Sequence, residues 1–498
     1  MPKPKVSRRV SSPARSTNPP LSQTKPMSYQ PLSALPGGAG DAASKAQQQP
    51  NASSLSCIAN LTNTILGSGM LGLPFAFSAA GSVTGTLLLL VAATFSSNGL
   101  FLLSVAADKV GITPSKPSSF YSVAQAAYPP STALIDFAVA FKCFGVATGY
   151  LITVGDCMVD AMKFISKEDS GSLLVIQRQF WIVLASLLVA SISFFRTLDA
   201  LKYTSMVSVV FVLAMTVVII LYSMGIEGMS PCKDYAPPDD DLEAVCVGEK
   251  DSFTTFESTM SNLAVFVFSF TCHQNIFSVC NELKERTQAK VNTVIFISIG
   301  AALLLYLLVA WSGFNTFGSS LQSDILLNYP QNGLVTTMRI FVALLVIFSY
   351  PLQLDPSRRC IITLINKLRK TPETDDFTPV KDDEEASTSK HSETDASINS
   401  KEPSPNSDGW GENVMFYGIT TAFLLASFSL AMIVTSLGTI LNVVGATGST
   451  MVSYILPGLV YIKLFEAEDS WRKRGAMVQV AVGCVIIPVA LYYIFHKD

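Results

Sequence analysis

Two hydrophobic segments of the chain are each interrupted by glycine-rich or polar residues whose backbone could bind a ligand. The first interruption covers residues 67–74 within an apolar run at 56–80, and the second covers residues 269–275 within an apolar run at 259–280. Lipid supplies no hydrogen bonds, so a helix broken inside a membrane must be buried in protein or line a cavity. Two broken helices at matching places are typical of the substrate site of a secondary transporter. We therefore expect the two interruptions to form one site.

The first interruption consists of glycines around a short apolar sequence. Residues 67–72 match G-x-G-x-x-G, but they lie in an apolar helix and the next acid, Asp108, is too far along for dinucleotide binding. Glycines let the backbone leave helical geometry and let a ligand approach it closely. We expect Pro74 to start a second half-helix, with free N–H groups near residues 69–71 that face a carboxylate. Close helix packing through small residues is the alternative.

Several titratable side chains fall within the predicted spans. His273 is the only histidine there, and an imidazole suits a proton-linked step; a histidine bonded to a neighbouring carbonyl is the alternative. Lys142 lies inside the third span, so it should face the bundle interior and have a partner. It either supplies a fixed positive charge or pins one helix to another. Asp136 and Asp156 lie near the ends of this span, and we expect them to be solvated or to cap a helix.

Oxygen-bearing side chains near two of the spans could coordinate a small cation. Four of the residues at 60–64 are Asn or Thr, and Asn63 is one turn before the glycines. Hydrogen bonding between helices is the alternative role for these residues. Near the end of the eighth span, Pro351 frees a backbone carbonyl one turn earlier, and Ser349 places a hydroxyl beside it.

The composition indicates a membrane protein. Of 498 residues, 49% are hydrophobic and 14% are charged, against about 25% charged in an ordinary soluble domain. The net charge of −3 gives no reason to expect a nucleic-acid partner. Windows of about 20 apolar residues mark eleven spans. They lie at 56–80, 84–106, 133–160, 177–195, 201–225, 259–281, 291–313, 333–354, 412–436, 440–463 and 475–495.

Charge and polarity divide the rest of the chain. Lys and Arg concentrate in segments that are cytoplasmic if the N-terminus is cytoplasmic, which the positive-inside rule favours. We expect residues 1–53 to be a disordered cytoplasmic tail and residues 361–411 a disordered acidic cytoplasmic loop, separating helices one to eight at 54–360 from helices nine to eleven at 412–498. The outer loop at 226–256 holds Cys232 and Cys246, which either close a disulfide or remain free thiols.

Three of these segments together resemble a known family. Residues 60–74, NLTNTILGSGMLGLP, resemble the first-span signature of the amino acid/auxin permease family. Residues 142–156, KCFGVATGYLITVGD, are similar to the third span of its fungal vacuolar amino acid exporters. Residues 270–283, FTCHQNIFSVCNEL, resemble the sixth span of that branch and of the sodium-coupled neutral amino acid transporters.

The resemblance implies an all-α protein with eleven transmembrane helices in the bacterial leucine-transporter fold, which is a 5+5 inverted repeat plus one helix. It implies that the substrate's carboxylate binds at the break in span 1 and its amine at the break in span 6. The substrate contacts would be Asn63, Gly67, Ser68, Gly69, Met70, Leu71, Ser269, Phe270, Thr271 and Cys272. The resemblance implies that Asn63 and Ser349 would bind a coupling sodium ion. The full set of candidate ion-coupling residues adds Leu66, His273 and Lys142.

These observations predict a secondary active amino acid transporter that works by alternating access and is coupled to a proton or sodium gradient. The alternative is an amino acid sensor that signals through its cytoplasmic tail. We expect no enzymatic activity, because the sequence lacks a phosphate-cradling loop and a metal-spaced His/Cys set, and we expect no cofactor beyond the coupling ion. The expected partners are the amino acid, the lipid bilayer, and kinases or trafficking adaptors on the cytoplasmic segments. The vacuolar or lysosomal membrane is favoured, with the plasma membrane as the alternative.

Overall fold

The fold was analysed in a computed structural model of the chain. It describes residues 52–67, 69–111, 118–167, 174–194, 202–226, 229, 231, 246–369 and 408–496. Residues 1–51 of the predicted tail at 1–53, and most of the predicted acidic loop at 361–411, lie outside these residues. Within the described ranges the regular structure is helical, apart from one isolated bridge between Ala52 and Leu283.

Eight segments are long and apolar enough to cross a membrane, so the chain is a polytopic membrane protein. Three shorter apolar helices accompany them: α3 (Gly69–Ala80), α7 (Arg178–Ser193) and the part of α8 at Ser208–Ser223. The eight long segments are α4 (Ser82–Val110), α6 (Ser131–Ser166), α10 to α11 (Phe256–Glu282), α12 (Gln288–Phe317) with the turn after it, α13 (Gly333–Arg369), α14 (Asp408–Ile433), α15 to α16 (Leu437–Leu464) and α17 (Trp471–Phe495). Both ends of the segment at 361–411 are therefore helical, because α13 continues to Arg369 and α14 begins at Asp408.

The predicted interruption of the first span is present. The chain forms α2 (Ser54–Ile65), leaves helical geometry at Leu66 and Gly67, and resumes at Gly69 as α3. The expectation that Pro74 starts the second half-helix is wrong, since α3 begins five residues earlier and Pro74 lies inside it. Pro74 is the sixth residue of α3, so its missing N–H leaves the carbonyl of Met70 without the usual intrahelical donor.

The second interruption is also present. Helix α10 (Phe256–Ser269) begins at the cap residue Thr255, whose hydroxyl accepts a hydrogen bond from Ser258 N. After Ser269 the chain is irregular and then forms one 3₁₀ turn, η6 (His273–Asn275), before α11 (Ile276–Glu282). The tenth apolar run contains a third irregularity that the sequence did not predict. Its helix α15 (Leu437–Val444) passes into π-helical turns at Gly445–Ser449 and Met451–Ile455 before α16 (Leu456–Leu464).

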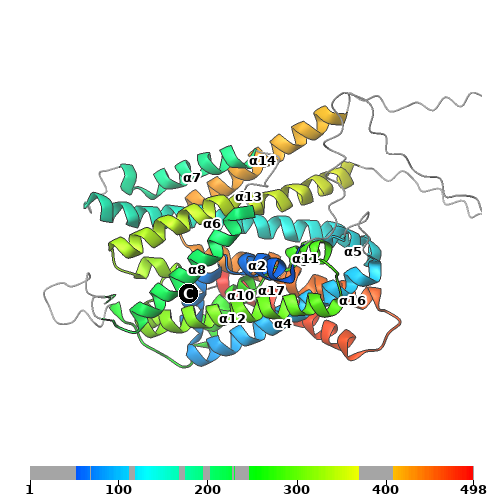
Figure 1. Ribbon diagram of the computed structural model, residues 1–498, viewed down its shortest axis with the longest axis horizontal. Helices are drawn as coiled ribbons and strands as arrows, with labels where there is room; N and C mark the ends of the chain where they lie inside the picture. Colours follow the sequence, from blue (N-terminus) through cyan, green and yellow to red (C-terminus); the bar gives the residue numbers. More distant parts are fainter. Residues whose placement is uncertain are drawn as a thin grey trace, which may run out of the picture. The chain divides into compact units, whose positions relative to one another are not determined.

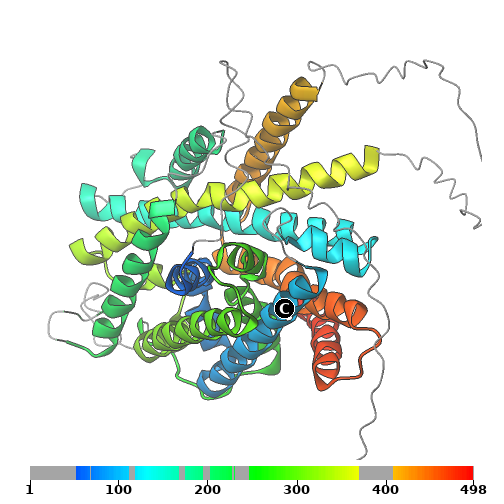
Figure 2. The same ribbon diagram turned by 45° about the vertical axis from the view of Figure 1, so that its right-hand side comes forward.

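The helices pack in two groups (Figures 1 and 2). In one group α6 runs alongside α13 and also packs against α7 and α14. In the other, α10 packs against α3, while α12 packs against α2 and α4. The π-helical turns after α15 contact both α6 and α10 and therefore join the two groups.

A second connection links the two broken spans at one end. Ala52, just before α2, donates its backbone N–H to Glu282 O at 2.9 Å and accepts from Lys284 N at 3.0 Å. The beginning of α2 is thus hydrogen-bonded to the end of α11 through peptide groups.

Packing at the π-helical turn generates a stability prediction. A Cβ atom added at Gly445 would lie 2.2 Å from the carbonyl oxygen of Ala264 on α10, so Gly445→Ala forces two backbones apart. We expect a loss of about 1–3 kcal/mol in the free energy of unfolding. Gly418→Ala on α14 is the matched control, because a Cβ there meets no atom within 4 Å. Thermal unfolding of the purified variants in detergent tests this, and equal midpoints would contradict it.

Candidate functional site

The two helix breaks lie against each other. A Cβ atom added at Gly69, the first residue of α3, would lie 3.0 Å from the Cα and 3.0 Å from the Oγ of Ser269, the last residue of α10. One at Gly67 would lie 3.6 Å from the hydroxyl of Tyr150 on α6. Glycine at position 69 therefore permits this approach, and the two breaks are in contact with each other.

Tyr306 on α12 connects the carbonyl ends of the two half-helices. Its hydroxyl oxygen lies 2.6 Å from Ile65 O at the end of α2 and 3.0 Å from Ser269 O at the end of α10. A phenol has one proton to donate, so the two carbonyls share it. Helix C-termini carry partial negative charge, and Tyr306 is 0% exposed. The sequence analysis missed this residue; its one signal is a hydroxyl in the middle of an apolar span.

Three consecutive carbonyl groups at the second break each accept a hydrogen bond from a side chain of a different helix. Ser269 O accepts from Tyr306 on α12, and Phe270 O accepts from Ser96 Oγ on α4 at 2.7 Å. Thr271 O accepts from Lys142 Nζ on α6 at 3.3 Å. Irregular backbone at this depth is thus satisfied from three directions, which holds the break open and positions it against α3.

Lys142 is buried, as the sequence predicted, but its partner is a carbonyl group. It is 4% exposed, and among the described residues no carboxylate lies within ion-pair distance of its Nζ. Its Cβ faces Gly448 in the π-helical turn, where an added Cβ would come within 2.9 Å. Lys142 therefore places its amino group at the second break, between α6 and the π-helical segment, and its role as a charge or as a link between helices stays a prediction.

His273 lies in a separate polar cluster behind the break. It is 0% exposed, and neither ring nitrogen has a hydrogen-bond partner in the described part of the chain. A Cβ atom added at Gly99 would lie 2.6 Å from its Nε2 and 2.8 Å from the Nε2 of Gln479, which donates to Ser453 O. His273 thus faces α4, α17 and the π-helical segment.

The predicted oxygen ligands for a cation are not joined in this structure. Ser349 Oγ donates to Leu345 O, one turn back on α13, at 2.8 Å. Asn63 is half-buried on α2, and no hydrogen bond in the described ranges links it to Ser349. Leu66 is 3% exposed at the end of α2. The role of these three residues in binding an ion stays a prediction.

The structure describes some of the remaining predicted site residues and leaves others outside the described ranges. Met70, Leu71 and Cys272 are buried beside the breaks, whereas Ser68 lies outside the described residues. Cys246 is disulfide-bonded, but Cys232 also lies outside the described residues, so their pairing stays a prediction.

The two aspartates of span three are not solvated, contrary to expectation. Asp136 is 6% exposed. Asp156 accepts from Arg178 on α7 at 2.6 Å. Asp156 is partly exposed and is held by this ion pair, whereas Asp136 Oδ2 is buried without a hydrogen-bond partner in the described part of the chain.

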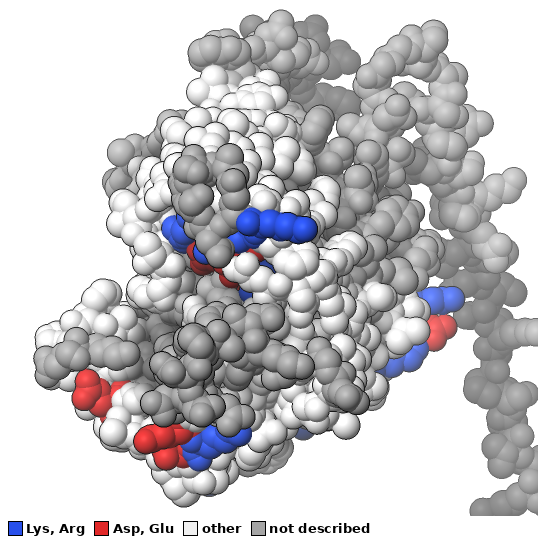
Figure 3. Space-filling view, turned by 90° about the vertical axis from the view of Figure 1, so that its left-hand side faces the viewer, with Lys and Arg blue, Asp and Glu red and all other residues white. Residues whose placement is uncertain are grey.

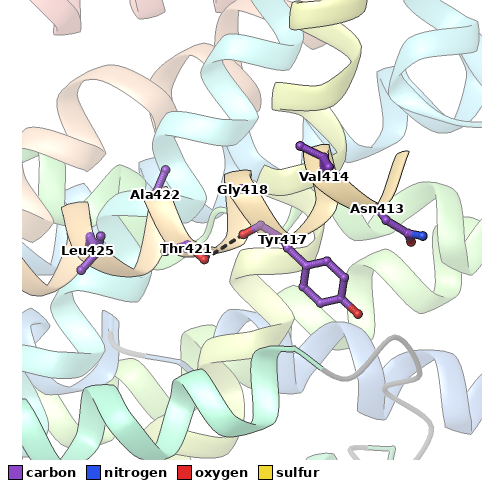
Figure 4. A pocket seen from close by; sticks show the side chains of 7 residues that line it. All are labelled: Asn413, Val414, Tyr417, Gly418, Thr421, Ala422 and Leu425. Carbon is purple, nitrogen blue, oxygen red and sulfur yellow. Dashed lines mark hydrogen bonds between the residues drawn. The ribbon is translucent and has the colours of Figure 1, made fainter. Parts of the chain in front are cut away.

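A groove on α14 is separate from this site (Figure 4). All of its lining residues belong to α14, and none belongs to either break. The side chains of Tyr417 and Leu425 are exposed there, and the groove lacks a charged group. An exposed apolar helix face in a membrane protein contacts lipid, so we do not assign the groove to the substrate. It is lined by Asn413, Val414, Tyr417, Gly418, Thr421, Ala422 and Leu425.

Comparison with known proteins identifies the family of the chain. The profile of the family described as transmembrane amino acid transporter protein matches residues 50–495. The chain belongs to this family of amino acid transporters. It is a transporter and not an enzyme.

Three relatives illustrate the range of the family. The transporter is similar to vacuolar amino acid transporter 5 of Schizosaccharomyces pombe, with 34% identity over 82% of this chain and 83% of the relative. It is similar to vacuolar amino acid transporter 5 of Saccharomyces cerevisiae, with 33% identity over 82% and 88%. It also matches sodium-coupled neutral amino acid transporter 7 of Danio rerio, with 24% identity over 88% and 85%.

The shared hydroxyl of Tyr306 generates the next prediction. Tyr306→Phe leaves two buried carbonyl groups short of a donor, which costs about 1–3 kcal/mol. We expect a lower unfolding midpoint of the purified transporter. Tyr492→Phe is the control, because that side chain is 56% exposed on α17. If both variants unfold at the wild-type temperature, the hydroxyl does not connect the two half-helices.

Proposed function

We propose that this protein is a secondary active transporter that carries an amino acid across a membrane by alternating access, driven by a proton or sodium gradient. The amino acid binds between the break of α2 and α3 and the break of α10 and α11. We further propose eleven spans arranged as a 5+5 inverted repeat plus one helix, with α2 and α3 forming the first span and α10 and α11 the sixth. The vacuolar membrane is favoured, because relatives named as vacuolar transporters cover most of the chain.

The observation that carries this proposal is the convergence of two carbonyl ends on one hydroxyl. Ile65 O and Ser269 O both lie within hydrogen-bond distance of Tyr306 Oη. An ammonium group has several N–H donors and could bond both carbonyls at once, which a phenol cannot. At the start of α3, Met70 N donates to Gly67 O at 3.1 Å, and the other first N–H groups, which lack intrahelical acceptors, suit a carboxylate. Backbone groups of opposite polarity thus match the part that all amino acids share, and we expect wide substrate tolerance.

Two arrangements support alternating access. The helices that form the breaks pack on one another and on α4 and α12, so they can move together against α6, α7, α13 and α14. Lys142 supplies a fixed positive charge at Thr271 O and joins the two groups through one hydrogen bond. We propose Lys142 and His273, with Asn63, Leu66 and Ser349, as the candidates for coupling to the ion.

Transport in proteoliposomes tests the function directly. Purified protein is reconstituted, a panel of radiolabelled amino acids is offered, and a pH or sodium gradient is imposed separately. We expect accumulation above the equilibrium level for several amino acids with one of the two gradients. Failure to accumulate any amino acid with either gradient, in vesicles that contain correctly folded protein, would overturn the proposal.

Gly69→Val tests the location of the substrate site. The valine side chain would be driven into the backbone of Ser269 and fill the space between the two breaks. We expect transport to be lost while membrane insertion and expression are retained. Gly300→Val on α12 is the matched control, because a Cβ there meets no atom within 4 Å. Normal flux in Gly69→Val would remove the breaks as the site.

The role as an amino acid sensor stays a prediction from the sequence. The tail at 1–53 that would carry the signal lies almost entirely outside the described residues.

A further inference from the structure

The loop between α12 and α13 covers α3, the half-helix that follows the first break. We call residues 318–329 the lid; they include the 3₁₀ turns Gly318–Ser320 and Ile325–Asn328. Ser78 on α3 donates its hydroxyl to Gly318 O at 2.8 Å, and a Cβ added at Gly72 would lie 3.4 Å from Ser323 O. The lid therefore packs on α3 on the side that the positive-inside rule assigns to the outside or the lumen.

The lid contains a buried carboxyl group with an unsatisfied oxygen. Asp324 is 1% exposed and caps the turn that follows it, because its Oδ1 accepts from Leu326 N at 3.0 Å. Its Oδ2 has no hydrogen-bond partner in the described part of the chain. Burying a charged oxygen without a donor is costly, whereas a protonated carboxyl avoids most of this cost.

None of the charged groups around Asp324 forms an ion pair with it in the described part of the chain. Helix α6 presents Asp156 and Asp160, with the Cys157 thiol between them. Arg178 on α7 is engaged by Asp156 at 2.6 Å. Arg339 on α13 donates Nη2 to Leu326 O and Tyr329 O and lies 3.4 Å from Asp160.

The cluster thus has three carboxyl groups and two arginines. Arg178 is paired with Asp156, whereas Arg339 uses only its Nη2 in the contacts above, and its Nε and Nη1 have no hydrogen-bond partner in the described part of the chain. Burial raises the pKa of Asp324 to about 7. The carboxylates of Asp156 and Asp160 raise this pKa further, whereas the Leu326 N–H and Arg339 lower it.

Acidic and basic side chains lie next to one another on the face of the protein shown in Figure 3.

We propose that Asp324 is a proton-binding site, and that a proton taken up on its Oδ2 from the outer solution stabilises the lid in its packed position over α3. The proton comes from water on that side and returns to water when the lid lifts. Proton binding at Asp324 would make the proton a coupling ion only if the protein is a transporter, so this part of the inference rests on the proposed function.

The sign of the pH effect follows from the two positions of the lid. When the lid is lifted, Asp324 is hydrated and its pKa returns toward about 3.9, the ordinary value for aspartate. The packed lid binds the proton more tightly, so it is most stable in acid. Its stability falls as pH rises, and the packing equilibrium changes by roughly tenfold per pH unit between about pH 4 and pH 7. Above this range the effect levels off.

Thiol labelling measures the lid directly in the full-length protein. Ser323→Cys places a thiol on the lid next to Asp324, where Ser323 is half-buried against Gly438. Its rate of reaction with a membrane-impermeant maleimide is divided by that of Ser252→Cys, an exposed position on the same side, to remove the effect of pH on thiol reactivity. We expect this ratio to rise between pH 5 and pH 7 by roughly tenfold per unit. A ratio that does not change with pH would overturn the inference.

Substitution of the carboxyl identifies the group responsible. Asp324→Asn keeps an acceptor for Leu326 N and resembles the protonated acid, so the ratio should be low at every pH. Asp324→Glu keeps a titratable group and should preserve the pH dependence with a shifted midpoint. Asp251→Asn is the matched control, because Asp251 is exposed on the same side, and it should behave as wild type. If Asp324→Asn retains the wild-type dependence, Asp324 is not the proton site.

Uptake by proteoliposomes separates this inference from the proposed function. The initial rate of amino acid uptake should depend on outer pH in the wild type and in Asp251→Asn, but not in Asp324→Asn. Transport with unchanged pH dependence in Asp324→Asn would overturn the inference and leave the proposed function standing. Suppose instead that no variant transports an amino acid, while labelling loses its pH dependence only in Asp324→Asn. This result would overturn the proposed function and leave the inference about Asp324 standing.

Discussion

The architecture depends on satisfying peptide carbonyl groups that have left a helix inside the membrane. At the second break, Ser269 O, Phe270 O and Thr271 O each have one side-chain donor, and the donors come from α12, α4 and α6. An unsatisfied carbonyl in lipid would cost several kcal/mol, estimated at about 2–7 for a buried amide. These three contacts therefore fix the position of the break relative to most of the bundle. They also explain why Lys142 is tolerated at this depth.

The sequence predicts the places where the chain breaks but not the groups that stabilise the breaks. Glycines at 67–72 and polar residues at 271–275 identify both interruptions, because such residues are rare inside apolar runs. A single hydroxyl such as that of Tyr306 or Ser96 has no local pattern that reveals its acceptor. The acceptor is set by helix packing, which a single sequence does not encode in its periodicity.

Packing also accounts for the other differences. Pro74 lies within α3 instead of starting it, because glycines supply the beginning of that helix. The π-helical turns at 445–455 have the same apolar character as an α-helix, so hydropathy places one continuous span there. Asp324 lies in a short polar loop that looks solvated in the sequence, and only the fold of the loop onto α3 buries it.

The pair of backbone hydrogen bonds at Ala52 restricts how the protein can open at this end of the bundle. They join the beginning of α2 to the residues that follow α11, at the opposite end of the bundle from the lid. Because peptide groups form them, most side-chain substitutions leave them intact. A swing of α2 away from its neighbours must either break both bonds or pull α11 along with it. The two broken segments are thus mechanically linked at this end, and a force on the chain at residue 52 acts on both of them at once.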